Sequence, residues 1–205
     1  MDYESFLRKA TESLRSLPPA GDVLDQVLRH ERLQRRGTWV EFGVAKGESL
    51  RRIVANRGDA RVWGFDTFDG LPEDWKPGLS KGTFAVEQIP RIPGAHLVTG
   101  LFSDVLPAWH PREPVTFVHI DCDLYSAAKC ALSHVRPMLA DGAIIVFDEL
   151  LNYPGFEKHE MRALYEVTEE DGLRYEWLLA GGGADSWLSE RAAILVYSDH
   201  ASADG

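Results

Sequence analysis

Two short acidic clusters are notable because each one ends an apolar run. Asp121 closes the run "VTFVHID" and Asp123 follows two residues later, and Asp148 and Glu149 close "AIIVFDE". Carboxylates held close together repel one another unless a cation lies between them or one of them keeps its proton. Oxygen donors gathered in this way suit a hard divalent cation. A single acid at such a place is more commonly a helix cap or a solvated charge, so the clustering carries the argument.

The apolar pattern predicts the elements that position these acids. Near-continuous apolar strands separated by helical stretches are typical of an α/β fold with a mostly parallel sheet covered on both faces. In such sheets ligands bind at the carboxyl ends of the strands, where both acidic clusters fall. We expect strands at 38–44, 61–68, 96–102, 115–121 and 143–149, a closing hairpin from 174–181 and 192–198, and helices at 48–58, 126–139 (capped by Ser126) and 159–172.

A glycine turn follows the first expected strand, in "VEFGVAKGES". Gly43 and Gly47 permit a tight turn with close backbone approach to a ligand, although glycines in this place also serve merely to turn the chain. Glu41 precedes the turn and would repel a pyrophosphate while suiting a cationic ligand. Asp66 ends the second strand, from where a carboxylate binds the hydroxyls of a ribose. A ligand with a ribose and a positive charge but no phosphate fits this pattern best, which indicates S-adenosylmethionine.

Five segments resemble the macrocin O-methyltransferase family, in family order and over roughly residues 38–165. They are "EFGVAKGES", "VWGFDTFDGLP", "GLFSDVLP", "HIDCDLYSA" and "VFDELLNYPGFEKHE". The resemblance implies a Rossmann-like, doubly wound, seven-stranded methyltransferase sheet with the last strand antiparallel. It also implies S-adenosyl-L-methionine, a divalent cation that is usually Mg²⁺, and a small-molecule hydroxyl acceptor, typically on a sugar of a natural product.

The resemblance also assigns site residues. The cofactor contacts that it implies are Glu41, Gly43, Gly47 and Ser49 at the methionine end, Asp66 at the ribose with Thr67 beside it, and Phe102 and Ser103 at the adenine. Asp121 is a further implied cofactor contact.

The implied metal ligands are Asp121, Asp148 and Glu149, the last of which is longer than the Asp or Asn common at that place. Asp123 then remains as the candidate general base, since a hydroxyl must lose its proton as it attacks a methyl group. His119, in the strand before these acids, is expected to be a core histidine. Tyr153 is expected either to line the acceptor pocket or to be an ordinary core aromatic.

Length, charge and composition limit the possible partners, compartment and domain organisation of the chain. The 205 residues carry a formal net charge of −10, which argues against nucleic acid or an anionic membrane as a partner. Two cysteines outside any CxxC pair, no signal-peptide pattern and no long apolar run lead us to expect a cytoplasmic protein. The expected organisation is an N-terminal helical cap (1–36), a methyltransferase domain (37–200) and a tail (201–205), with a homodimer left open.

The acceptor is the least specified feature. Trp75, Trp109 and Trp187 are candidate platforms for a sugar or aromatic acceptor. Two other functions stay in competition: a non-catalytic S-adenosylmethionine-binding partner subunit, and an NAD-dependent oxidoreductase. The absence of GxGxxG and the presence of Glu41 argue against the oxidoreductase, and the acidic set argues against the binding subunit.

Overall fold

A computed structural model describes residues 1–182 and 189–197, so Trp187 and the expected tail 201–205 lie outside the described residues. Within the described part, seven strands form one sheet in the order β3-β2-β1-β4-β5-β7-β6. The strands are β1 (Thr38–Phe42), β2 (Arg61–Asp66), β3 (Ala95–Thr99), β4 (Val115–Ile120), β5 (Leu139–Phe147), β6 (Arg174–Ala180) and β7 (Ala192–Tyr197).

The first five strands pair in parallel, whereas β7 runs antiparallel to both of its neighbours, β5 and β6. This is the seven-stranded methyltransferase sheet with its last strand inserted antiparallel, so the predicted fold class is confirmed. The expected hairpin is the pair β6 and β7.

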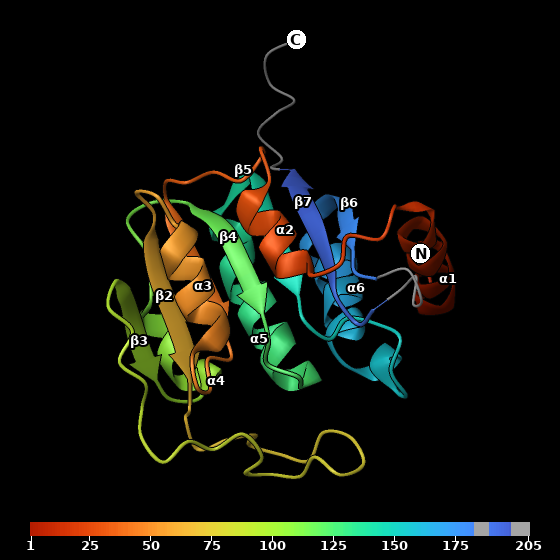
Figure 1. Cartoon of the computed structure of the whole chain (residues 1–205). Helices are drawn as coiled ribbons and strands as arrows, with labels where there is room; N and C mark the ends of the chain where they lie inside the picture. The colour runs from red at the N-terminus through yellow and green to blue at the C-terminus, as the bar shows by residue number, and fades with distance from the viewer. Residues whose placement is uncertain (183–188, 198–205) are drawn as a thin grey trace.

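Helices cover both faces of the sheet (Figure 1). Helices α2 and α3 lie in front of the sheet in this view, α5 and α6 lie behind it, and α1 lies beside the edge strand β6. Each face has its own apolar core, one containing Phe42, Ile120 and Leu164 and the other Leu28, Leu50 and Phe117. The helices are α1 (Tyr3–Ser16), α2 (Val23–Arg29), α3 (Glu48–Asn56), α4 (Phe102–Val105), α5 (Tyr125–Val135) and α6 (Glu160–Asp171), with 3₁₀ turns at Leu106–Ala108, Arg136–Met138 and Phe156–Lys158.

Local signals explain most helix ends. Asp2 and Asp22 cap α1 and α2, each accepting a hydrogen bond of 2.9 Å from a backbone N–H three residues later. Gly172 ends α6 in the left-handed region, as expected. The prediction for Ser126 was wrong: α5 begins at Tyr125, and the Ser126 hydroxyl instead donates to Glu73 at 2.7 Å.

The long connection between β2 and β3 crosses below the carboxyl ends of the strands, where Figure 1 shows it as a yellow loop. Its path is fixed by turns, with residues 82–86 hydrogen-bonded back to Phe68 and Leu71. This connection therefore forms one wall of the space at the carboxyl edge of the sheet. None of the helices in the described part of the chain is long and apolar enough to cross a membrane.

Candidate active site

A cavity of about 360 Å³ lies at the carboxyl edge of the sheet. The ends of β1, β2, β4 and β5 line it, together with the β2–β3 connection and the start of α5. Eight of the predicted site residues are in this lining: Gly43, Asp66, Thr67, Phe102, Ser103, Asp121, Asp123 and Glu149.

The remaining predicted residues do not figure in the described lining: Glu41, Gly47, Ser49 and Asp148. Sequence reasoning in turn missed several residues that do line the cavity, chiefly Leu71 and Phe84 in the β2–β3 connection and Ser126, Ala127 and Cys130 on α5. The long, Pro- and Gly-rich connection was the available signal for Leu71 and Phe84, because loops of that length are usually functional.

The turn after β1 is held in place by Asp66. One carboxylate oxygen of Asp66 accepts hydrogen bonds of 2.7 Å from the backbone N–H groups of Val44 and Ala45. The other oxygen accepts one of 2.7 Å from Phe68 N–H. These bonds tie the end of β2 to the turn after β1 and hold an anion at the cavity wall. Because a carboxylate offers about four acceptor sites, it can still take a further donor from a ligand.

Gly43 is required by the sheet itself. Its φ of 94° lies in the left-handed region, and a Cβ atom built there would lie 1.7 Å from the carbonyl oxygen of Asp121. The close approach at Gly43 is therefore between the ends of β1 and β4, and the predicted approach to a ligand stays a prediction. Gly47 begins α3 with a φ of 76°, and a Cβ atom on it would lie 2.4 Å from Ile92 Cδ1.

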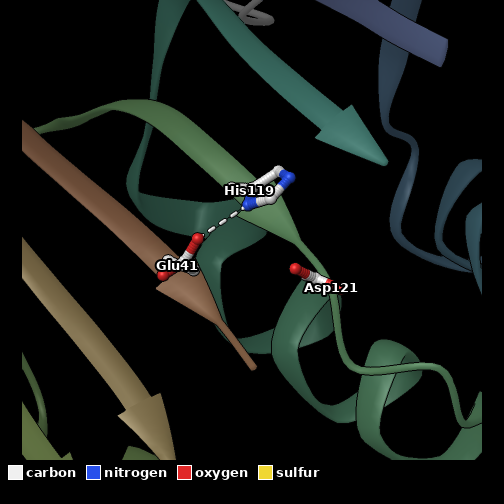
Figure 2. Close-up of side chains that lie close together, drawn as sticks. All are labelled: Glu41, His119 and Asp121. Atoms are coloured by element: carbon white, nitrogen blue, oxygen red, sulfur yellow. Dashed lines mark hydrogen bonds and ion pairs between the residues drawn. The ribbon is translucent and has the colours of Figure 1, made fainter. Parts of the chain in front are cut away.

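Glu41 is buried on the sheet face that α2 and α3 cover. It is the direct neighbour of His119 in the pairing of β1 with β4, so the two side chains emerge side by side (Figure 2). Glu41 Oε1 lies 2.9 Å from His119 Nδ1. Burial raises the pKa of Glu41, and the hydrogen bond from His119 opposes the rise. The expected core histidine is confirmed, and Glu41 contacts His119 from behind the cavity wall.

Strand alternation brings the metal-ligand candidates together. Asp121 and Asp148 continue the face of the sheet that carries His119, since each lies two residues beyond a residue of that face. Oxygen atoms of Asp121, Asp148 and Glu149 all lie within 4.8 Å of one another. The structure thus brings the three carboxylates together, and their role as metal ligands stays a prediction.

Burial favours the protonated form of two carboxyls in the acidic cluster. Burial, only partly offset by the charge of His119, raises the pKa of Asp121 to about 8. Burial and the neighbouring Asp148 raise the pKa of Glu149 to about 9. Among the residues that the structure describes, Oε2 of Glu149 is buried and has no hydrogen-bond partner. An orphaned carboxylate oxygen among all-oxygen donors fits a hard divalent cation such as Mg²⁺, so the residues present match the group that the resemblance implies.

Asp123 lies in the cavity wall beside this cluster. Its φ of 64° turns the chain sharply after β4, and 7% of the residue is exposed. Burial raises the pKa of Asp123 to about 6, with Lys76 limiting the rise. A carboxyl with a pKa near neutrality can both accept and release a proton, which suits a general base.

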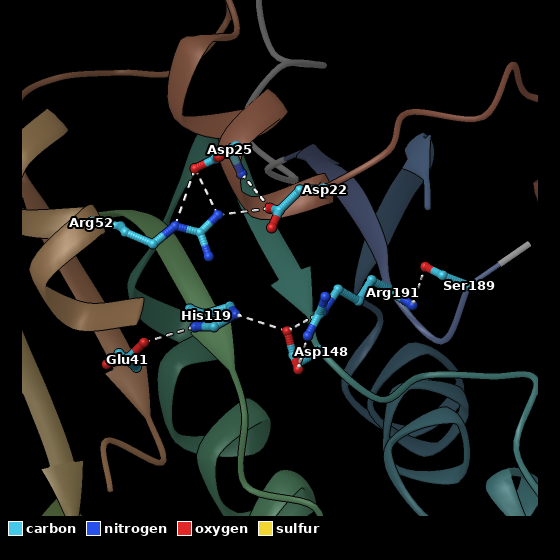
Figure 3. Close-up of polar contacts among 8 residues, drawn as sticks. All are labelled: Asp22, Asp25, Glu41, Arg52, His119, Asp148, Ser189 and Arg191. Carbon is cyan, nitrogen blue, oxygen red and sulfur yellow. Dashed lines mark hydrogen bonds and ion pairs between the residues drawn. The ribbon is translucent and has the colours of Figure 1, made fainter. Parts of the chain in front are cut away.

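Asp148 has an ion-pair partner that sequence reasoning missed. Arg191 Nε donates to Asp148 Oδ1 at 2.5 Å and Arg191 Nη2 donates to Oδ2 at 2.9 Å (Figure 3). On the other side, His119 Nε2 lies 3.9 Å from Asp148 Oδ1. A continuous polar chain thus runs from Glu41 through His119 and Asp148 to Arg191.

The β2–β3 connection places aromatic and basic groups near the acids. Trp75 and Tyr153 pack with ring centroids 5.8 Å apart, and Lys76 Nζ lies 3.7 Å and 4.4 Å from their respective centroids. Trp109 lies elsewhere: it is 6% exposed and packs against Phe65 with centroids 5.1 Å apart. The prediction of Trp109 as an acceptor platform is therefore wrong, because the ring is part of the core.

A family model matches the part of the chain that contains this site. The family model described as a methyltransferase domain matches residues 40–150, more than half of the chain. This range contains the glycine turn, Asp66 and all four acids at the sheet edge.

Two curated relatives are natural-product enzymes. One is the 8-demethyl-8-(2,3-dimethoxy-alpha-L-rhamnosyl)-tetracenomycin-C 4'-O-methyltransferase of Streptomyces olivaceus, 27% identical over 180 residues, covering 73% of this chain and 69% of the relative. The other is the demethyldecarbamoylnovobiocin O-methyltransferase of Streptomyces niveus, 25% identical over 161 residues, covering 65% of this chain and 61% of the relative. The chain thus spans 69% and 61% of the lengths of these relatives.

A solved structure agrees with the observed fold. The calicheamicin methyltransferase CalS11 superposes with a TM-score of 0.64 at 29% identity, over 85% of this chain and 76% of that one. The resemblance to macrocin O-methyltransferases is confirmed by these matches to methyltransferases of natural products. From its family match, its sheet and its relatives, the chain belongs to the methyltransferase-domain family and is a methyltransferase.

Proposed function

We propose that this chain transfers a methyl group from S-adenosylmethionine to a hydroxyl of a small molecule, with the help of a divalent cation. The observation that carries the proposal is the meeting of Asp121, Asp148 and Glu149 at a cavity whose wall also contains Asp123 and the turn after β1. A methyl donor and an acceptor hydroxyl must lie side by side for in-line transfer, and this edge of the sheet supports both.

The cofactor would lie along the ends of β1 and β2. Asp66 has acceptor capacity left for the ribose hydroxyls beyond its three backbone donors. Thr67, Phe102 and Ser103 continue the wall and would contact the ribose and adenine. Glu41 and Ser49 would act from behind the turn, since neither is in the described lining and a hydrogen bond from Ser49 lowers the pKa of Glu41.

The metal would be held by Asp121 and Glu149, with Asp148 as the third carboxylate. A bound Mg²⁺ would supply positive charge that lowers the pKa of an acceptor hydroxyl. Asp123 would take the proton at its carboxylate as the hydroxyl attacks, and the cavity walls would align the reacting atoms.

The acceptor is proposed to be a sugar hydroxyl of a natural product. The names of the relatives support this class: one acts on a rhamnosyl-bearing tetracenomycin, and CalS11 is described as a TDP-rhamnose 3'-O-methyltransferase. Trp75 is partly exposed and packs on the buried Tyr153, and although neither ring is in the described cavity lining, we propose Trp75 as the aromatic surface for the apolar face of a deoxysugar.

The test is calorimetric titration with S-adenosylhomocysteine, with and without Mg²⁺, and with NAD as the competing ligand. We expect the nucleoside to bind and NAD not to bind, and Asp66→Ala to weaken nucleoside binding. Binding of NAD alone would contradict the proposal. Nucleoside binding without methyl transfer to any sugar hydroxyl, with Mg²⁺ present, would instead favour the non-catalytic binding subunit.

A further inference from the structure

Asp148 differs from the other proposed metal ligands because both of its carboxylate oxygens are already engaged. Arg191 contacts Oδ1 and Oδ2 at 2.5 Å and 2.9 Å, a two-pronged arrangement that matches the guanidinium fork to the carboxylate. In contrast, Oε2 of Glu149 is buried with no hydrogen-bond partner in residues 1–182 and 189–197. One member of the acidic cluster is thus neutralised by a side chain and another is not.

The position of Arg191 follows from the topology of the sheet. The antiparallel pairing of β5 with β7 sets Phe147 opposite Ala192, so the residues just beyond them, Asp148 and Arg191, meet at the sheet edge. A parallel strand would place its carboxyl end there instead.

Backbone hydrogen bonds fix the segment further. Leu150 N–H donates to Glu190 O at 2.8 Å, and Gly181 N–H donates to Arg191 O at 2.9 Å. Arg191 is therefore presented to Asp148 by the frame of the sheet, so its contact with the carboxylate is built into the fold.

From this geometry we infer that Arg191 competes with the divalent cation for Asp148 and so weakens metal binding. The inference rests on the proposed function, because it concerns the same acidic cluster. A guanidinium and a metal ion bind to the same oxygen lone pairs of a carboxylate, and two positive charges a few ångströms apart repel each other. His119 faces Asp148 from the other side at 3.9 Å, which restricts the directions from which a third group can reach it.

The alternative role, in which Arg191 strengthens metal binding, defines the test of the inference. Groups that hydrogen-bond to a metal ligand commonly orient it, and removing them then weakens metal binding by about 10- to 100-fold. If Arg191 were mainly an orienting residue, its removal would lower metal affinity. If Arg191 competes with the metal, its removal raises that affinity. The sign of the change therefore separates the two roles.

The experiment is calorimetric titration of Mg²⁺ and Mn²⁺ into the whole chain and three variants. Arg191→Gln should bind both ions more tightly, by about tenfold or more, because a neighbouring positive charge is lost. Arg191→Lys should lie in between, since it keeps the charge but not the two-pronged geometry. Arg32→Gln is the matched control: Arg32 is an exposed arginine that pairs with Glu176 at 3.0 Å, and its loss should leave metal affinity unchanged. Arg52 does not serve, because its partner Asp22 also acts on the charge of Arg191.

A second measurement follows the displacement directly. In the wild-type protein, the NMR signal of the Arg191 Nε–H should shift when Mg²⁺ is added, and that of Arg32 should not. Thermal melting of each variant shows whether it is folded. Arg191→Lys is the more conservative change and serves if Arg191→Gln does not fold.

Unchanged or weaker metal binding by Arg191→Gln would overturn the inference while leaving the proposed function intact. Absence of metal binding by both wild type and Arg191→Gln, with S-adenosylhomocysteine still bound, would overturn the inference together with the metal part of the proposed function. Failure of the wild type to bind S-adenosylhomocysteine would count against the proposed function itself.

Discussion

The carbonyl oxygen of Asp121 lies 1.7 Å from the point that a Cβ atom on Gly43 would occupy. Gly43→Ala must therefore push apart the ends of β1 and β4, in addition to placing a side chain at a positive φ. We expect it to lower the free energy of unfolding by about 3 kcal/mol or more, measured by urea denaturation.

Gly78→Ala is the control for this prediction. Gly78 has a similar φ of 88°, but no atom lies within 4 Å of the place that a Cβ atom on it would take. Gly78→Ala should lower the free energy of unfolding by about 1–2 kcal/mol, the cost of placing a side chain on a left-handed backbone. Equal losses for the two variants would show that the close approach at Gly43 is relieved at no cost.

Asp123→Asn should retain S-adenosylhomocysteine affinity and lose turnover. Asn tolerates a positive φ as well as Asp does, so the turn at 64° should persist. The amide cannot accept the acceptor's proton, and loss of a general base typically lowers the rate by about 10²- to 10⁴-fold. The measurement is kcat with a sugar acceptor beside a binding isotherm. Normal turnover would rule out Asp123 as the base.

Metal affinity should rise with pH and release protons. The pKa values of about 8 for Asp121 and about 9 for Glu149 mean that both carboxyls are largely protonated at pH 7 in the absence of a cation. A cation binds their ionised forms, so binding must displace the protons, and less displacement is needed as pH approaches 9. Calorimetry in buffers of different ionisation enthalpy measures the release directly. Proton uptake, or an affinity independent of pH between 7 and 9, would contradict it.

Phe84 should contact the bound cofactor. It lines the cavity, yet 49% of it is exposed and its φ is 69°, a backbone conformation that bulky residues seldom adopt away from ligand sites. Phe84→Ala should weaken S-adenosylhomocysteine binding by about 2- to 10-fold, the size of a lost aromatic contact.

Ile89→Ala is the matched control for Phe84, because Ile89 is 52% exposed on the same connection and is not in the described cavity lining. Equal effects of the two variants would show that the change reflects the loop as a whole.

The sequence predicts the residues whose position depends on one strand at a time. Asp66, Asp121 and Glu149 each follow an apolar run, so their place at the sheet edge can be read from local pattern and from the rule that parallel strands end together. The helix end at Gly172 is local in the same sense.

What could not be predicted depends on which strands are neighbours. The contact of Glu41 with His119 requires the register of β1 against β4, and the pairing of Asp148 with Arg191 requires that β7 lie beside β5. Phe84 reaches the cavity through hydrogen bonds between two parts of one irregular connection. None of these relationships leaves a periodic trace in the sequence.

The place of β7 between β5 and β6 has a consequence for the order of folding. A sheet that has not yet received this strand leaves the edge of β5 open, and Asp148 then has no guanidinium beside it. The contact between residues 148 and 191 is therefore a marker of completion: it forms only when β7, with its hairpin partner β6, is added to the edge of β5. Pairing of this hairpin with β5 is a long-range step, and we expect it to contribute to the slow phase of refolding.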